Sequence, residues 1–535
     1  MVGIPGLSKK IAVMWMVIVA TFGGATLAQA QVTAFKQAVA EAAARDKDVA
    51  NFYKSTAYAP VWTGKGNKFR DRRKALFGAL DSAADHGLSE ARYDIEKLKA
   101  SLKAAKSSRD LGKIEVALSK TFLTYARDVQ TGMLKPSNID SGIVRKIPYR
   151  DRVQYLTNFS KSSPSRFLKS LAPETPEYAR LMKEKMNLEK LLAKGGFGEK
   201  VASKKLEPGS TGPAVAQLRN RLIRMKFLKR SATKTYDSSI QKAVQQFQLA
   251  HGLNPDGVAG AGTIKEINQP AEARLQSVIV SMERERWTNM PRGKRHVWVN
   301  LTDFSAVIMD NGKETFRTRS VIGKNVSDRV SPEFSDVMEH LVINPTWNVP
   351  RSIATKEYLP MLKKNRNAVS HLRLVDSRGR TVNRSNVDFS QYTKASFPFN
   401  IKQPPSKTNA LGLVKFMFPN RHNIYLHDTP AKNLFSREVR AYSHGCIRLA
   451  DPFDFAYELL SKQESNPKGF FHAKLDSGRE TTVPLKQHVP VHIVYRTAFT
   501  KAKGHMQYRR DVYGRDAKIW RALAKQGVAL RAVRG

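Results

Sequence analysis

Cysteine is almost absent from this sequence: its 535 residues include one, Cys446. A single cysteine cannot form a disulfide within the chain, which excludes a disulfide-stapled fold. Such a residue is either a buried packing residue or a free thiol used in chemistry. Free thiols are a liability in an oxidising compartment, so in an exported protein a lone cysteine favours the chemical interpretation.

Acidic residues are also scarce relative to basic ones. The 46 Asp and Glu residues accompany 91 Lys and Arg residues, which gives a net charge of +45 and a pI near 10.3. A positive field of this size attracts polyanions such as nucleic acid, anionic lipid or an acidic cell-wall polymer. The basic residues are spread along the whole chain instead of forming a compact patch, so charge alone does not choose among these partners.

The first 30 residues have the order of regions found in a secretory signal peptide. Lys9 and Lys10 precede an apolar run over 11–22, and Ala28-Gln29-Ala30 offers a cleavage site of the small-x-small type. An uncleaved membrane anchor is the alternative, since residues 11–30 carry no charge, but the short apolar core favours cleavage. Export argues against a nucleic-acid partner and favours an anionic envelope polymer. We expect membrane association only if the signal is retained.

The chain is too long for one ordinary domain, and its patterning predicts a multidomain α+β protein. Residues 31–175 have helical periodicity and predict a scaffold domain, and residues 206–270 predict a compact three-helix unit. Short β-rich runs over 275–499 predict a catalytic domain, with a polar insertion at 350–407 that suggests a lid or binding subdomain. Residues 500–535 predict a basic helical tail.

Three phrases within residues 206–270 form a specific pattern. They are P-G-x-x-G-P-A-V-x-x-L, A-V-x-x-F-Q-x-x-H-G-L and D-G-V-A-G-x-x-T. Together they resemble the small peptidoglycan-binding module of bacterial wall enzymes. A three-helix spacer without a ligand is the alternative interpretation.

The chemistry-bearing residues surround Cys446. The segment Ser443-His444-Gly445-Cys446-Ile447-Arg448 lies shortly after His427, which precedes Cys446 by 19 residues. An imidazole beside a thiol can remove its proton and later protonate the leaving group. We therefore predict that Cys446 is a nucleophile and His427 its general base and acid. The backbone N–H groups of Gly445 and Cys446 are the natural oxyanion donors, with His444 as an added donor or a support for the loop.

We expect the imidazole to act by ion pairing. A free thiol with a pKa near 8.5 is only about 3% thiolate at pH 7, and an ion pair with His427 would raise that fraction. A zinc site built from His427, His444 and Cys446 is a competing interpretation, but no fourth ligand is evident. A packed, unreactive cysteine is another. We predict a nucleophile that needs no metal or other cofactor.

The motifs H-D-T-P at 427–430 and S-H-G-C-I-R at 443–448 resemble the signature of L,D-transpeptidases, the penicillin-independent cross-linking enzymes of bacterial walls. Phrases at 344–347, 410–412 and 415–420 resemble the large envelope members of that family. The resemblance implies a periplasmic enzyme that acts on peptidoglycan stem peptides. Cys446 would attack the L-to-D bond of a tetrapeptide stem and release D-alanine, and the side-chain amine of a second stem would then take the acyl group.

The resemblance also implies roles for neighbouring residues. His427 would be oriented by a backbone carbonyl near Asp428, and Arg448 would bind a stem carboxylate or brace the loop. Tyr425 and Trp347 would line the cleft or pack in the core. Two other functions use the same chain: an L,D-carboxypeptidase, in which water takes the acyl group, and a non-catalytic wall-binding protein.

Overall fold

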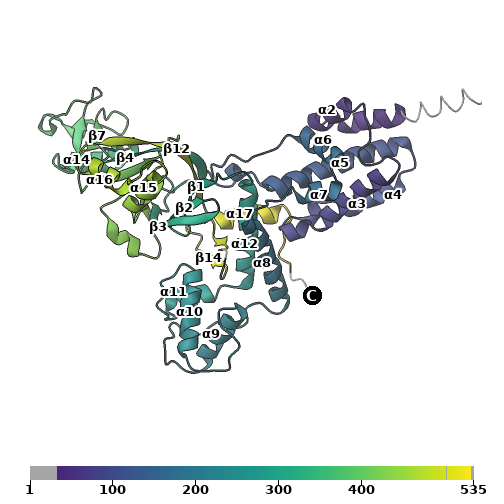
Figure 1. The fold of residues 1–535 in the computed structure, drawn as a ribbon, viewed down its shortest axis with the longest axis horizontal. Coiled ribbons are helices and arrows are strands. Elements are labelled where there is room, and N and C mark those ends of the chain that lie inside the picture. Colours follow the sequence, from purple (N-terminus) through teal and green to yellow (C-terminus); the bar gives the residue numbers. More distant parts are fainter. Residues whose placement is uncertain (1–32, 502, 532–535) are drawn as a thin grey trace, which may run out of the picture.

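The computed structural model describes residues 33–501 and 503–531, so the predicted signal peptide at 1–30 lies outside it. Three lobes meet at one long helix, α12 (Ala271–Trp287) (Figure 1). A helical lobe lies on one side, a β-rich lobe on the other, and a small three-helix lobe below. Within the described ranges, no helix is long and apolar enough to cross a membrane.

The helical lobe is built around its longest helix, α5, which begins with a capping box between Ser107 and Asp110. The buried carboxylate of Glu115 on α5 accepts hydrogen bonds from the backbone N–H groups of Val61 and Trp62, and so holds the aromatic loop against the helix. The helices of this lobe are α2 (Lys47–Ser55), α3 (Asn67–Asp81), α4 (Ile95–Ala104), α5 (Ser108–Thr131), α6 (Arg152–Lys161), α7 (Pro164–Lys169) and α8 (Pro176–Ala193).

The small lobe is the predicted three-helix unit, with helices α9 (Pro213–Arg224), α10 (Ser238–Ala250) and α11 (Ala261–Ile267). Its core comes from one apolar face of each longer helix, including Leu218 and Leu222 of α9 and Val244 and Phe247 of α10. Apolar residues at helical spacing thus fold into a core of their own.

A nine-stranded mixed sheet forms the β-rich lobe, in the order β10-β3-β11-β9-β8-β4-β12-β1-β2. Strand β3 also pairs with β2, so the row of strands closes on itself, with the short strand β10 at its edge. The strands are β1 (Arg295–Asn300), β2 (Ser305–Asp310), β3 (Lys313–Gly323), β4 (Phe334–Ile343), β8 (Val414–Met417), β9 (Leu426–His427), β10 (Ala441–Ser443), β11 (Ile447–Leu449) and β12 (Thr481–Val494). Helices α15 (Pro452–Leu460) and α16 (Pro467–Leu475) pack against it.

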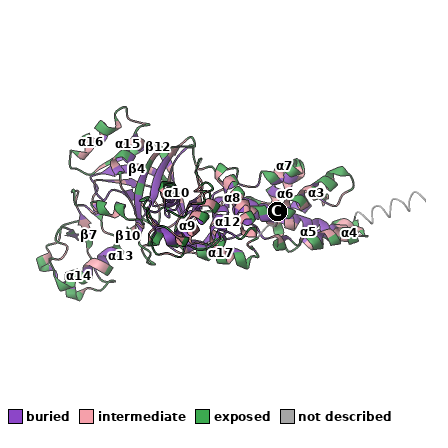
Figure 2. Ribbon diagram, turned by 90° about the horizontal axis from the view of Figure 1, so that it is seen from below, coloured by how far each residue is buried: buried purple, intermediate pink, exposed green. Residues whose placement is uncertain are grey.

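The insertion at 350–407 forms a small unit with its own core. A three-stranded sheet, β5 (Trp347–Asn348), β7 (Asn400–Gln403) and β6 (Arg373–Val375), packs with the helical run α13 (Arg351–Ile353), η4 (Ala354–Tyr358) and α14 (Leu359–Lys364). Figure 2 shows that the strands of the large sheet and helix α5 carry much of the buried surface, whereas the outer face around α14 is exposed.

The C-terminal segment returns to the centre of the molecule. The short strands β13 (Ala498–Phe499) and β14 (Gln507–Tyr508) pair with each other, and α17 (Arg515–Lys525) follows. Ile519 and Leu523 of α17 are buried in the same core as the helical lobe. The tail is therefore an integral part of the fold.

Buried ion pairs join the lobes where α12 meets α17. Arg284 of α12 pairs with Glu333 and with Asp516, and Glu333 also pairs with Arg515. All four side chains are almost wholly inaccessible to solvent. Removing one partner from such a network leaves a buried charge uncompensated, which is strongly destabilising. These contacts fix the catalytic lobe relative to α12 and α17.

Candidate active site

The register of two parallel strands brings the predicted catalytic residues together. Leu426 of β9 pairs with Ile447 of β11, and His427 pairs with Arg448. Leu426 and Ile447 are both fully buried in the apolar core. Because successive side chains alternate between the two faces of a sheet, Cys446 lies on the same face as His427. Residues 19 positions apart in the sequence thus come to one face of the sheet.

His427 is oriented by the carbonyl oxygen of Asp428, to which its Nδ1 donates a hydrogen bond. That bond leaves Nε2 as the basic nitrogen. Burial, followed by the positive charge of Arg448, lowers the pKa of His427 to about 3. The imidazole is therefore neutral at pH 7.

Cys446 is half-buried, and its Sγ donates to the carbonyl oxygen of Asn423 at 3.4 Å. Burial raises the pKa of the thiol to about 11, and hydrogen bonds involving Tyr425 and the positive charge of Arg448 oppose this only in part. The expectation that His427 would hold Cys446 as a thiolate by ion pairing is therefore wrong for the resting site. The cause is desolvation, which disfavours the charged form of both groups.

The turn before Cys446 requires glycine. Gly445 has a φ of +116°, a conformation that side-chain-bearing residues rarely adopt. Its carbonyl oxygen accepts a hydrogen bond from the Ser331 hydroxyl at 2.6 Å. Among the residues that the structure describes, the N–H groups of Gly445 and Cys446 donate to no other group. The turn therefore presents two unused donors beside the sulfur, as an oxyanion site needs.

Three parts of the chain match known families. Residues 294–468 match the model described as "L,D-transpeptidase catalytic domain", 211–267 match the "Putative peptidoglycan binding domain", and 47–184 match the "Scaffold domain". Residues 294–468 form an L,D-transpeptidase catalytic domain. The resemblance found in the sequence is confirmed, as is the division into a helical region, a peptidoglycan-binding domain and a β-rich catalytic domain.

The individual proteins that this chain resembles have low sequence identity to it. A "Putative L,D-transpeptidase" from Haemophilus influenzae is 28% identical over 242 residues, which are 45% of this chain and 48% of the relative. The chain thus spans about half the length of this curated relative. The L,D-transpeptidase of Xylanimonas cellulosilytica (residues 123–326) is 16% identical, with coverage of 55% of this chain and 100% of that one and a TM-score of 0.17. A fused Zn-dependent amidase/peptidase with a peptidoglycan-binding domain from Clostridium acetobutylicum is 13% identical, with coverage of 54% and 99% and a TM-score of 0.15. The assignment rests on the family models, because TM-scores this low carry no argument.

Two cations flank the histidine of the transpeptidase domain. Arg448 is the strand partner of His427 on one side and Lys415 is its partner on the other. Over the described part of the chain, neither cation makes an ion pair, and Arg448 Nε has no hydrogen-bond partner. Arg448 therefore does not brace the loop through Asp451, whose carboxylate instead accepts from Thr318. An unpaired cation beside the nucleophile is suited to bind a carboxylate.

The other predicted residues of the transpeptidase domain lie in different environments. The Tyr425 ring packs edge-on against His427, with 5.7 Å between ring centroids. Trp347 is buried in the core of the insertion, edge-on to Tyr358. His444 is exposed, and its Nε2 contacts Glu357 of the insertion at 2.9 Å. His444 thus ties the catalytic loop to the insertion, and no cluster that could hold a metal is found in 33–501 and 503–531.

The sequence did not indicate the residues that support the catalytic loop through hydrogen bonds. Ser331 supports Gly445, its own N–H donates to the Tyr513 hydroxyl, and that hydroxyl donates to the carbonyl oxygen of Gly323. Lys415 belongs to the segment 415–420 that resembles the family, but no role for this residue follows from the sequence. No spacing or motif connects Ser331 or Tyr513 to Cys446, because their contacts form only when the sheet closes and the C-terminal segment packs against it.

Proposed function

We propose that this protein is a cysteine-dependent L,D-transpeptidase that cross-links two diamino acids of peptidoglycan stem peptides. One observation carries the proposal: the register of β9 and β11 puts Cys446 on the same sheet face as the neutral His427, beside two unused N–H donors. The peptidoglycan-binding domain at 211–267 supports peptidoglycan as the partner. The site of action is the periplasm.

The first half-reaction forms a thioester. As Cys446 Sγ attacks the carbonyl carbon of the L-to-D peptide bond, His427 Nε2 accepts the thiol proton. The N–H groups of Gly445 and Cys446 stabilise the oxyanion. His427 then gives its proton to the departing amine, the C–N bond breaks, and D-alanine leaves.

The second half-reaction transfers the acyl group. The side-chain amine of another stem attacks the thioester, and His427 accepts a proton from that amine. His427 then passes this proton to the Cys446 sulfur as the C–S bond breaks, so Cys446 leaves as a thiol. The covalent intermediate conserves the energy of the old amide, so the new bond forms without ATP. Since the thiol has a higher pKa than the imidazole, proton transfer accompanies the attack instead of preceding it.

The unpaired cations give the site its preference for acidic stems. Arg448 and Lys415 lie on the two strands next to His427, on the face where the stem must lie to reach Cys446. A stem carboxylate bound there relieves the cost of keeping these cations half-buried without a partner. The high positive charge of the whole chain favours approach to an anionic wall.

Purified protein and tetrapeptide muropeptides test the proposal, with products identified by mass spectrometry. Wild-type protein should give cross-linked dimers and free D-alanine, and the Cys446→Ala variant should give neither. Dimers formed by Cys446→Ala would refute the proposal. Tripeptide without dimers from the wild type would show instead that water takes the acyl group.

A further inference from the structure

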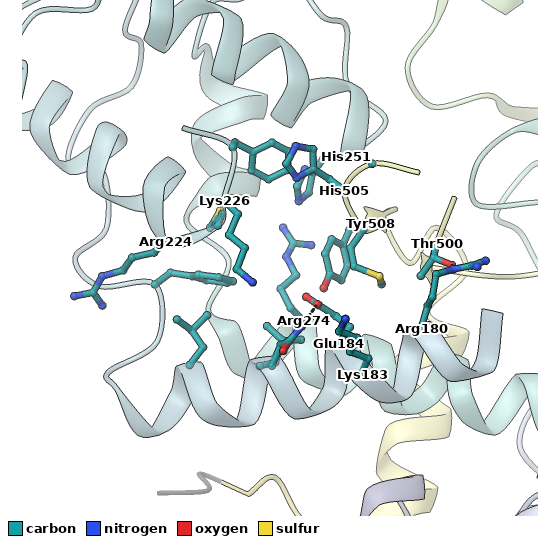
Figure 3. A pocket seen from close by; sticks show the side chains of 18 of the residues that line it. Arg180, Lys183, Glu184, Arg224, Lys226, His251, Arg274, Thr500, His505 and Tyr508 are labelled. Carbon is teal, nitrogen blue, oxygen red and sulfur yellow. Dashed lines mark hydrogen bonds between the residues drawn. The ribbon is translucent and has the colours of Figure 1, made fainter. Parts of the chain in front are cut away.

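One unassigned cavity lies outside the catalytic domain. A cavity of about 540 Å³ opens where α8, the peptidoglycan-binding domain and the C-terminal segment meet (Figure 3). Its volume is in the range of about 300–1,000 Å³ usual for pockets that hold a small ligand. None of its lining residues lies within 294–468. The cavity is therefore separate from the cysteine site.

Positive charge dominates the wall of this cavity. Its lysines and arginines are Arg180, Lys183, Lys190, Lys194, Arg224, Lys226, Arg274 and Lys501, whereas Glu184 is its one acidic residue. Burial raises the pKa of Glu184 above its usual range, and a hydrogen bond from Asn187 and the charge of Lys226 oppose this shift. In the described structure, Lys183, Lys190, Lys194 and Lys226 make no ion pair with an acidic side chain. A group of unpaired lysines around one cavity leaves an excess of charge that an anionic ligand would neutralise.

An apolar and aromatic wall faces these cations. The Phe227 ring stacks on His505 with 4.1 Å between centroids, and Leu188, Leu191 and Met506 continue the surface. Arg274 is held in place by Glu266 at 2.7 Å and lies over the Tyr508 ring. A ligand for this cavity therefore combines carboxylate or phosphate groups with a body that packs on an aromatic surface.

The backbone at Lys226 holds its side chain at the edge of the cavity. Helix α9 ends in a Schellman motif, in which Phe227 N–H donates to the Leu222 carbonyl and Lys226 N–H to the Ile223 carbonyl. Lys226 has a φ of +66°, at the position where glycine is usual. Its side chain reaches into the cavity, as Figure 3 shows. Unfavoured backbone conformations held by side-chain-bearing residues cluster at ligand sites.

We propose that this cavity binds the acidic stem peptide of a peptidoglycan strand, its carboxylates on the lysines and its apolar atoms on the aromatic wall. The proposal rests on the proposed function and adds a second contact with the wall, shared between the peptidoglycan-binding domain and the helical lobe. A stem peptide fits better than a bare anion because part of the wall is apolar and aromatic. Binding there would hold one strand while the cysteine site works on another segment.

The test is calorimetric binding of a disaccharide-tetrapeptide muropeptide to the full-length Cys446→Ala protein, which cannot turn it over. Adding Lys190→Glu and Lys226→Glu reverses the charge on two walls of the cavity and should weaken binding at least tenfold. The matched control adds Lys113→Glu and Lys169→Glu, the same charge change on exposed lysines of the helical lobe. The control should change binding less than twofold.

Two further measurements identify the ligand chemistry. A muropeptide with amidated carboxylates should bind at least tenfold more weakly, and inorganic phosphate at matched ionic strength should not compete. Lys226→Gly removes the cost of holding a side-chain-bearing residue in the left-handed conformation, so it should raise the unfolding midpoint. It also removes the ammonium group, so it should still weaken binding. A loss of affinity in this variant is then not a folding defect.

Three outcomes would overturn the proposal: equal binding by the cavity and control variants, equal binding of the amidated fragment, or competition by phosphate. The first two would show that the stem carboxylates do not bind this cavity, and the third that it is a phosphate site. Cross-linking by the chain with an intact Cys446 is measured separately. Its absence would refute the proposed function, whereas normal cross-linking without cavity binding would refute only this inference.

Discussion

The hydroxyl of Ser331 donates a hydrogen bond to the carbonyl oxygen of Gly445, at 2.6 Å, on the residue directly before Cys446. The same hydroxyl accepts a hydrogen bond from the N–H of Gly323. The hydroxyl of Tyr513, in the C-terminal segment, accepts from the N–H of Ser331 and donates to the carbonyl oxygen of Gly323. The bond from Ser331 fixes the direction of the Gly445 carbonyl. The turn thereby keeps the conformation in which the N–H groups of Gly445 and Cys446 donate to no other group. The orientation of the oxyanion donors thus depends on a residue 114 positions away in the sequence.

Removing this bond should lower the rate of cross-linking. The Ser331→Ala variant leaves a buried carbonyl without a partner, which costs about 1–3 kcal/mol. If this free energy is lost from the stabilisation of the oxyanion in the transition state, kcat should drop roughly 5- to 150-fold with little change in KM. Tyr513→Phe loosens the same brace and should give a smaller fall in kcat. Normal kcat in both variants, measured as D-alanine release, would show that the brace does not position the turn.

The thiol of Cys446 should react slowly at neutral pH. Because burial raises its pKa to about 11, the rate of alkylation by iodoacetamide should climb steadily from pH 7 to pH 10. Arg448→Gln removes a positive charge that favours the thiolate, so alkylation at a given pH should slow further. Arg437→Gln, an exposed arginine nearby in the sequence, is the control and should leave the rate unchanged. A plateau below pH 8 would mean that the resting site holds a thiolate.

Acid should destabilise the catalytic domain through His427. Its pKa is about 3 in the folded protein, against about 6.5 in an unfolded chain, so between these values only the unfolded state binds the proton. Stability is fully present above pH 6.5 and is lost as the pH falls toward 3, by at most about 1.4 kcal/mol per pH unit. His427→Gln removes this titration, and its urea midpoint should fall less than that of the wild type between pH 7.5 and 4.5. The control, His371→Gln, changes an exposed histidine and should behave as the wild type. Parallel losses in His427→Gln and wild type would contradict the prediction.

The contact between the catalytic loop and the insertion should be a weak, releasable one. Glu357 bonds to both His444 and Arg329, and all three side chains are partly exposed. Exposed ion pairs contribute about 0–1 kcal/mol each, so Glu357→Gln should leave the unfolding midpoint unchanged. It should, however, increase hydrogen exchange over 351–364, because the helical run loses its tether to the loop. Glu314→Gln, which breaks an exposed pair with Arg317 on β3, is the matched control. Unchanged exchange would show that the insertion is held by its apolar contacts alone.

Local patterns predicted much of the fold. The periodicity of 31–175 indicated a helical region, residues 206–270 indicated a three-helix unit, and the short apolar runs over 275–499 indicated strands. The motifs around His427 and Cys446 likewise identified the family. In each case the information lies in residues a few positions apart, where helical and strand periodicity decide the structure. The protonation states at the site were not predictable in this way, because they follow from desolvation.

The sequence by itself determined the catalytic domain, the peptidoglycan-binding domain, and the segments that carry the nucleophile and its base. Only the tertiary structure decided that the resting pair is neutral, that Ser331 and Tyr513 hold the catalytic turn, and that lysines from α8 and from the turn after α9 line one cavity. The physical reason is the range of the interactions. Periodicity and motifs act within a few residues, whereas burial, charge balance and long-range hydrogen bonds exist only once distant segments have packed together.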